Sequence, residues 1–179
     1  MGKRILNVGC GADTREGYVN LDKYKYPGVN VVHDLNKTPL PFKEKEFDAI
    51  IAQDILEHVN YVKLMPELFR VLKEGGTIKI RVPHFLYRNS YTDCTHINRF
   101  CVNTFLESFV KKDKVQDSLY GLKLFSRCKT YLEFEKRLLM PWNYLIEFLV
   151  NSSSTGLDFY ERTPLRIFPP KNILVELTR

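Results

Sequence analysis

Two stretches decide the fold of this 179-residue chain: Arg4-Ile-Leu-Asn-Val-Gly-Cys-Gly-Ala-Asp13 and Gly17-Tyr-Val-Asn-Leu-Asp22. In each, a short apolar run ends at turn-forming or acidic residues, which is the pattern of a buried strand. Gly9 and Gly11 let the backbone turn sharply and approach a ligand closely. The carboxylate of Asp22, at the tip of the neighbouring strand, can accept hydrogen bonds from both hydroxyls of a ribose. The pattern predicts a nucleoside site at the carboxyl edge of a parallel sheet.

Two kinds of nucleoside cofactor fit such a site, and the spacing of the sequence motif distinguishes them. A dinucleotide fingerprint needs a third glycine and an acidic residue about twenty positions further on. Here Thr14 occupies the third glycine position, and Asp22 follows Gly11 by only 22 − 11 = 11 positions. The connection has little room for a crossover helix. In this respect the chain resembles the class I S-adenosylmethionine-dependent methyltransferases, whose shorter glycine motif faces the methionyl part of the cofactor.

Further stretches extend the resemblance to a type 11-like, bacterial and archaeal subgroup of these enzymes. Asp34-Leu35 resembles the family's adenine-contacting position, Phe47–Ala52 its fourth strand, and Leu72–Thr77 the glycine turn before its fifth. The looser match at the carboxyl terminus includes Tyr160–Arg162 and Phe168–Pro170. The resemblance implies S-adenosylmethionine as the cofactor. The residues that it assigns to cofactor binding are Asn7, Gly9, Gly11, Asp22, Asp34, Leu35 and Gln53.

Three of these assignments have an alternative. The family often carries an acidic residue where this chain has Asn7, and Asp13 is a nearby carboxylate that could substitute for it. Asp22 could instead cap its own loop, and Asp34 could form an Asx turn with Asn36.

Periodicity and turn residues predict the order of the elements. Strands are expected at residues 4–8, 18–22, 29–34, 47–52, 77–82, 122–134 and 173–177. Helices are expected at 60–73, from 103 or 104 to 111, and from 138, with a long loop at 83–100. The prediction is an α/β, Rossmann-like, doubly wound, seven-stranded, mostly parallel sheet with an antiparallel last strand. A single domain over 1–179 would divide into a cofactor-binding half, 1–82, and an acceptor side, 83–179.

Composition restricts the location of the protein. The apolar stretch Leu138–Val150 is interrupted by Pro141, Asn143 and Glu147, and falls short of the roughly twenty residues of a membrane span. This stretch could pack in the core, cover a pocket as a lid, form a dimer face or associate shallowly with a membrane. The first strand leaves no room for a signal peptide, and the four cysteines form no Cys-x-x-Cys pair. We therefore expect a cytoplasmic protein with reduced thiols, and leave a homodimer open.

Charge is uneven along the chain, whose net charge is +6. Residues 1–60 carry 8 basic and 9 acidic side chains, and residues 61–179 carry the other 27 − 8 = 19 basic and 21 − 9 = 12 acidic ones. The run Lys111-Lys-Asp-Lys114 could attract phosphate, but a solvated helix end is the simpler explanation because no aromatic residues interleave it. We do not expect a nucleic-acid partner.

Catalytic candidates follow the fourth and fifth strands. Three histidines, His58, His84 and His96, fall in segments that should converge on one site. A hydroxyl acceptor needs a base, and histidine suits that task near neutral pH. We predict His58 or His96 as the base, Asp93 as the group that orients one imidazole, and His84 and Arg99 on the acceptor side.

Two other interpretations of the histidines stay open. They could order the loop without any chemistry, or His58, His84, Asp93 and His96 could bind a metal. Only Asp93 and His96 are close in sequence, so the sequence prediction is a site without a metal.

The family resemblance also narrows the acceptor. Gln53-Asp54-Ile55-Leu56 replaces the Pro-Pro motif of enzymes that methylate amino groups of DNA, and no cysteine lies where enzymes that methylate pyrimidine carbon carry one. We predict methyl transfer to a hydroxyl of a small-molecule or glycan-type acceptor. The alternatives are a non-catalytic, adenosine-nucleoside-binding regulatory protein and an RNA methyltransferase.

Overall fold

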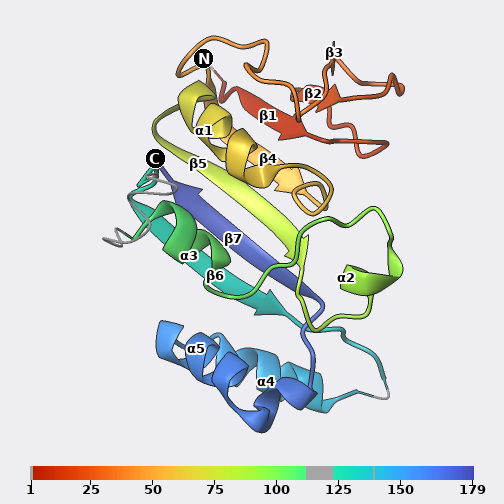
Figure 1. The fold of residues 1–179 in the computed structure, drawn as a ribbon, viewed down its shortest axis with the longest axis vertical. Coiled ribbons are helices and arrows are strands. Elements are labelled where there is room, and N and C mark those ends of the chain that lie inside the picture. Colours follow the sequence, from red (N-terminus) through yellow and green to blue (C-terminus); the bar gives the residue numbers. More distant parts are fainter. Residues whose placement is uncertain (1, 112–122, 139) are drawn as a thin grey trace.

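A single mixed sheet organises the computed structural model, which describes residues 2–111, 123–138 and 140–179. In this described part the sheet has seven strands in the order β3-β2-β1-β4-β5-β7-β6 (Figure 1). The strands are β1 (Ile5–Val8), β2 (Val19–Asp22), β3 (Val31–Val32), β4 (Phe47–Gln53), β5 (Leu72–Pro83), β6 (Arg127–Glu133) and β7 (Asn172–Thr178). The first five pair in parallel, and β7 is antiparallel to both β5 and β6. The predicted fold class, with its antiparallel last strand, is confirmed.

The register of the parallel strands brings their carboxyl ends to one edge. Val8 pairs with Leu21 on one side and with Ala52 on the other. Gln53 of β4 pairs with Arg81 of β5. The residues that follow β1, β2, β4 and β5 therefore lie side by side, as the sequence predicted.

Helix α1 (Tyr61–Val71) covers the centre of the sheet because its sequence is amphipathic. Its first turn is capped by Asn60, whose side chain accepts a hydrogen bond from the Lys63 amide at 3.2 Å. The helix ends directly in β5. Its buried face consists of Leu64, Met65, Leu68 and Val71.

An aromatic cluster joins α1 to α3 (Thr104–Phe109). The ring of Tyr61 lies 5.3 Å from that of Phe100, 6.2 Å from Phe105 and 6.1 Å from Phe109, measured between centroids. These edge-on contacts place both helices on the same face of the sheet (Figure 1).

Along β5, the exposed Lys79 alternates with the buried Ile78 and Ile80.

Helix α4 (Trp142–Val150) reverses the usual distribution of side chains. It buries Asn143 and Glu147, and exposes large apolar side chains, namely Trp142, Tyr144, Leu145, Phe148 and Leu149. Glu147 accepts hydrogen bonds from the Tyr131 hydroxyl (2.8 Å) and the Phe134 amide (2.9 Å), and pairs with Lys136 Nζ at 2.7 Å. Polar bonds therefore attach the helix to β6. The core-packing interpretation of this segment is wrong for most of its apolar residues.

Several predicted boundaries need correction. The third strand is only Val31–Val32 rather than 29–34, because this edge strand pairs with β2 at those two residues alone. The sixth runs over Arg127–Glu133; the predicted start at 122 lies outside the described residues, as does most of the lysine run after Lys111. The predicted loop 83–100 contains the short helix α2 (Asn89–Thr92).

A second inserted helix, α5 (Ser154–Arg162), was not predicted, nor was the 3₁₀ helix η2 (Pro164–Ile167) after it. The run Ser152-Ser-Ser-Thr-Gly156 is typical of a loop. In the structure the Ser153 hydroxyl accepts a hydrogen bond from the Gly156 amide at 3.0 Å and starts the helix. None of the helices in the described ranges is long and apolar enough to cross a bilayer.

Candidate functional site

The glycine turn after β1 lies at the carboxyl edge of the sheet. Both glycines are left-handed, with φ of 62° at Gly9 and 51° at Gly11. A Cβ at Gly9 would lie 2.2 Å from Ile55 Cγ1, so packing against the β4 side requires glycine there. A Cβ at Gly11 would meet no atom within 4 Å among the described residues. The turn thus leaves open space beside Gly11, where a ligand can approach the backbone.

Asp22 is 8% exposed and closes this turn. Its Oδ2 accepts a hydrogen bond from the Gly11 amide at 2.8 Å, and its Oδ1 accepts one from the Tyr24 amide at 2.9 Å. The loop-capping alternative is therefore realised. Each carboxylate oxygen can still accept a second hydrogen bond, so the binding of a ribose diol stays a prediction.

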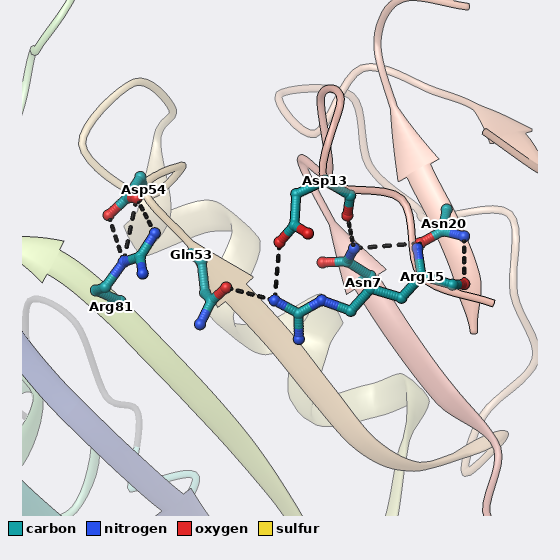
Figure 2. A network of polar contacts seen from close by, with 7 residues as sticks. All are labelled: Asn7, Asp13, Arg15, Asn20, Gln53, Asp54 and Arg81. Carbon is teal, nitrogen blue, oxygen red and sulfur yellow. Dashed lines mark hydrogen bonds and ion pairs between the residues drawn. The ribbon is translucent and has the colours of Figure 1, made fainter. Parts of the chain in front are cut away.

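A polar network holds the connection between β1 and β2 (Figure 2). The buried Asn7 amide donates to the backbone oxygen of Asp13 at 2.8 Å and to Asn20 Oδ1 at 3.2 Å. The Arg15 guanidinium bridges Asp13 Oδ2 (2.8 Å) and Gln53 Oε1 (2.7 Å), and so links the turn to the end of β4. Sequence analysis missed Arg15 and Asn20, because an isolated arginine or asparagine in a turn carries no distinctive pattern.

The second predicted cofactor segment follows β3. Asp34 Oδ1 accepts a hydrogen bond from the Asn36 amide at 2.9 Å, which is the Asx turn named as its alternative. Leu35 is buried and belongs to the core. A contact of either residue with adenine stays a prediction.

A cavity of about 770 Å³ lies at the ends of β4 and β5. Its lining is mostly polar: Asp54, Glu57, His58, Arg81, Pro83, Tyr87, Asn89, Thr92, Asp93, Cys94, His96, Glu133, Lys171 and Asn172. We call it the acceptor pocket. Asp54 and Arg81 form an ion pair between this pocket and Gln53 (Figure 2), with Arg81 Nε 3.0 Å from Asp54 Oδ1. The acceptor pocket therefore adjoins the cofactor edge.

A hydrogen-bond chain orients His58 in the acceptor pocket. The Thr95 hydroxyl donates to Asp93 Oδ1 at 2.6 Å, and hydrogen bonds from the Thr95 side chain and backbone lower the pKa of Asp93. The single hydroxyl proton is thereby used, so Thr95 Oγ1 must accept from His58 Nδ1, 2.9 Å away. In this tautomer the other ring nitrogen, Nε2, carries a free lone pair. Thr95, which sequence analysis missed, connects Asp93 to His58. The orienting role of Asp93 stays a prediction.

His96 packs beside His58. The two ring centroids are 4.7 Å apart, and Nε2 of His96 lies 3.6 Å from Asp93 Oδ2. Its Nδ1 is buried and has no hydrogen-bond partner among the described residues. Burial, and next the charge of His58, lower the pKa of His96, which favours a neutral ring.

Glu57 completes this group and was not identified from the sequence. The side chain is 2% exposed, and its Oε2 has no hydrogen-bond partner in the part of the chain that the structure describes. Burial raises the pKa of Glu57 to about 7. A carboxylate between the buried Leu56 and a site histidine was the available signal, since such a residue is costly to bury without a function.

Two predicted acceptor-side residues do not reach the pocket. His84 is fully buried. Its Nδ1 accepts from the Leu86 amide at 3.2 Å, and its Nε2 bonds Glu161 Oε1 at 2.9 Å, so it ties β5 to α5. Arg99 is exposed and lies over the Tyr91 ring, 5.0 Å from its centroid. The convergence expected of three histidines is therefore wrong for His84, because it packs with α5, a helix that the sequence did not reveal.

The strand order, the glycine turn and the acidic residue at the end of β2 are together typical of the class I methyltransferase fold. Residues 4–80 match the family model described as a methyltransferase domain. An uncharacterized protein of Methanocaldococcus jannaschii is 40% identical over 54 residues, which are 30% of this chain and 21% of that protein. The chain thus matches about a fifth of the length of this curated relative.

Solved structures share the fold over nearly the whole chain. A SAM-dependent methyltransferase from Archaeoglobus fulgidus is 16% identical, with a TM-score of 0.63, over 99% of this chain and 86% of that one. An S-adenosylmethionine-dependent methyltransferase from Mesorhizobium loti is 14% identical, with a TM-score of 0.53, over 99% and 91%. The resemblance drawn from the sequence is confirmed. Residues 4–80 thus match a methyltransferase domain, and the chain has the fold of S-adenosylmethionine-dependent methyltransferases. S-adenosylmethionine is the cofactor that this similarity implies.

Proposed function

We propose that this protein transfers a methyl group from S-adenosylmethionine to a hydroxyl of a small-molecule or glycan-type acceptor. We base the proposal on the hydrogen-bond chain from Asp93 through Thr95 to His58, a residue that lines the pocket beside the cofactor edge and whose neutral ring has one nitrogen left to accept a proton. Methyl transfer is an in-line displacement that depends mainly on how the reactants are positioned.

The cofactor edge has residues that fit the nucleoside part of S-adenosylmethionine. Asp22 has lone pairs left for the two ribose hydroxyls, and the open space beside Gly11 admits a ligand close to the backbone. When bound, the cofactor supplies a methyl group on a positively charged sulfur. The Arg15 guanidinium, held by Asp13 and Gln53, is a cation at this edge that could bind the carboxylate of the cofactor.

The lining of the acceptor pocket favours a hydroxylated acceptor. Carboxylates at Asp54, Glu57 and Glu133 can accept hydrogen bonds from hydroxyl groups, and Lys171 and Asn172 can donate to them. An acceptor hydroxyl placed against His58 would pass its proton to Nε2 as its oxygen attacks the methyl group. The positive charge that forms on the imidazole is stabilised by Asp93 through Thr95.

The two alternatives predict different behaviour. A regulatory protein would bind the adenosine part of the cofactor without turnover, and its pocket histidines would serve only to order the 83–100 loop. An RNA methyltransferase would require a basic surface next to the acceptor pocket. The acidic side chains that line the pocket argue against RNA, because they repel a phosphate backbone.

A calorimetric titration with S-adenosylhomocysteine, with NAD as control, tests the first half of the proposal. Selective binding of S-adenosylhomocysteine is expected. Labelled S-adenosylmethionine is then offered with a panel of sugars, polyols and phenols, and separately with RNA. Label on a hydroxyl compound that is lost in His58→Gln, while S-adenosylhomocysteine still binds, supports the proposal. Binding without any transfer favours the regulatory protein, and label on RNA alone contradicts the acceptor class.

A further inference from the structure

We propose that the acceptor pocket binds a divalent transition-metal cation through Glu57, His58 and His96. One possible ligand atom from each of these side chains lies within 4.8 Å of the other two. Atoms bound to one cation at about 2.0–2.2 Å lie within such a separation of one another. The sequence-based set of ligands, which contained His84 and Asp93 instead of Glu57, is thereby replaced.

Two of the ligand groups are buried and unsatisfied. Glu57 Oε2 and His96 Nδ1 have no hydrogen-bond partner among the described residues, although Glu57 is only 2% exposed and the His96 side chain only 8%. A buried polar atom without a partner costs free energy, so two such atoms on residues that are grouped within reach of one cation are consistent with a bound ligand. A cation satisfies both lone pairs at once.

The third ligand is oriented by its neighbours. Because His58 Nδ1 donates to Thr95, the lone pair of the neutral ring is on Nε2, which can bind a metal. Histidine ligands of metals usually donate their other ring proton to a carboxylate, carbonyl or hydroxyl group, which fixes the tautomer. Thr95 and Asp93 supply this outer shell to His58, and Asp93 Oδ2 lies 3.6 Å from the other nitrogen of His96.

The ligand types select the class of cation. Two imidazole nitrogens and one carboxylate suit Zn²⁺, Fe²⁺, Co²⁺ or Mn²⁺, whereas Mg²⁺ and Ca²⁺ prefer oxygen ligands. Three protein ligands leave coordination positions free, and all three residues line the acceptor pocket. The free positions can therefore bind the oxygen of an acceptor.

A bound cation would change how the acceptor hydroxyl loses its proton. This part of the proposal rests on the proposed function. An acceptor hydroxyl bound to the cation has a lowered pKa, so that its proton leaves to solvent rather than to His58, which is now a ligand. The oxygen then forms the new bond to the methyl carbon as the bond from that carbon to sulfur breaks. The products are a methyl ether and neutral S-adenosylhomocysteine, and no oxidant or reductant is needed.

A titration of chelator-treated full-length protein with Co²⁺, followed by its visible absorption, tests the site. We expect one equivalent to bind with a spectrum typical of nitrogen and oxygen ligands, and Zn²⁺ to displace it. Glu57→Gln and His96→Gln should each weaken binding at least about 100-fold. His33→Gln, which changes a histidine after β3 outside the pocket, is the matched control and should bind like the wild type.

Circular dichroism of each variant separates lost binding from lost folding, and a further variant, His58→Gln, serves if either of the first two fails to fold. No stoichiometric Co²⁺ binding by the wild type, or binding that survives both Glu57→Gln and His96→Gln, overturns the proposal. The same samples are titrated with S-adenosylhomocysteine. If that ligand binds and Co²⁺ does not, the metal site is refuted and the proposed function is not. If Co²⁺ binds but no hydroxyl compound is methylated, the proposed function is refuted and the metal site is not.

Discussion

The cofactor edge and the acceptor pocket lie next to each other on one sheet but satisfy their polar groups differently. At the cofactor edge the side chains of Asn7 and Arg15 bond to the protein itself (Figure 2), and so does that of Asp22. In the acceptor pocket Glu57 Oε2 and His96 Nδ1 are buried without a partner in the described part of the chain. The polar side chains of the first region are hydrogen-bonded before a ligand binds, whereas the second region has lone pairs that are left for a ligand.

This difference has an energetic meaning. Paired polar groups stabilise a loop and fix its shape, and a ligand there adds bonds to a surface that is already formed. Unpaired buried groups reduce stability in the free protein and are satisfied on binding. Substitutions at the cofactor edge should therefore change folding and cofactor affinity, and substitutions in the pocket should change chemistry more than stability.

The largest expected effect separates the two glycines of the turn. Gly9→Ala forces a Cβ to 2.2 Å from Ile55 at a φ of 62° and should lower the free energy of unfolding by about 3 kcal/mol or more. Gly11→Ala, at a φ of 51° with open space around it, should cost only about 1 kcal/mol. Urea unfolding of both variants measures the difference, and equal losses would contradict the role of packing at Gly9.

The next effect contrasts two acidic residues of the cofactor edge. Asp22→Asn removes the charge of the carboxylate that we predict to bind the ribose hydroxyls, and should weaken S-adenosylhomocysteine binding about 100-fold. Asp34→Asn keeps an oxygen for its Asx turn and should change affinity less than about threefold. Calorimetry gives both values. An equal loss in the two variants would support Asp34 as a direct cofactor contact.

His84→Gln tests the corrected assignment of a histidine outside the pocket. The variant disturbs the buried bonds to Glu161 and the Leu86 amide, and should lower the free energy of unfolding by about 2 kcal/mol. Cofactor affinity and the rate of methyl transfer should stay at the wild-type level. A variant of normal stability that loses activity would return His84 to the acceptor side.

The smallest effect sharpens the chemistry of the pocket. Thr95→Val removes the link between Asp93 and His58 and should lower the rate of methyl transfer about tenfold, with little change in stability because Thr95 is exposed. Thr95→Ser keeps the hydroxyl and should restore the rate. Single-turnover kinetics with saturating cofactor make the comparison, and equal rates in the two variants would exclude the relay.

How far the sequence predicts this structure depends on whether a signal is local. The strands β1, β2, β4 and β7 were placed to within one or two residues because each is a short apolar run next to turn residues. Helix α5 was missed because its start, Ser153 to Gly156, has the composition of a loop and is stabilised by a cap that sequence patterns show only weakly. The exposed apolar face of α4 was misjudged because burial is decided by what the rest of the chain covers.

The residues of the candidate site also differ in whether their positions depend on local sequence. The sequence by itself determined the sheet, the glycine turn and the position of Asp22 beside it, since strand ends and backbone conformations are fixed by neighbouring residues. Only the tertiary structure decided that Glu57 and His58 meet His96 and that His84 turns to Glu161 instead. These partners are distant in the chain, and their contacts depend on how the loop after β5 folds over the edge. A pattern of single residues carries no information about that path.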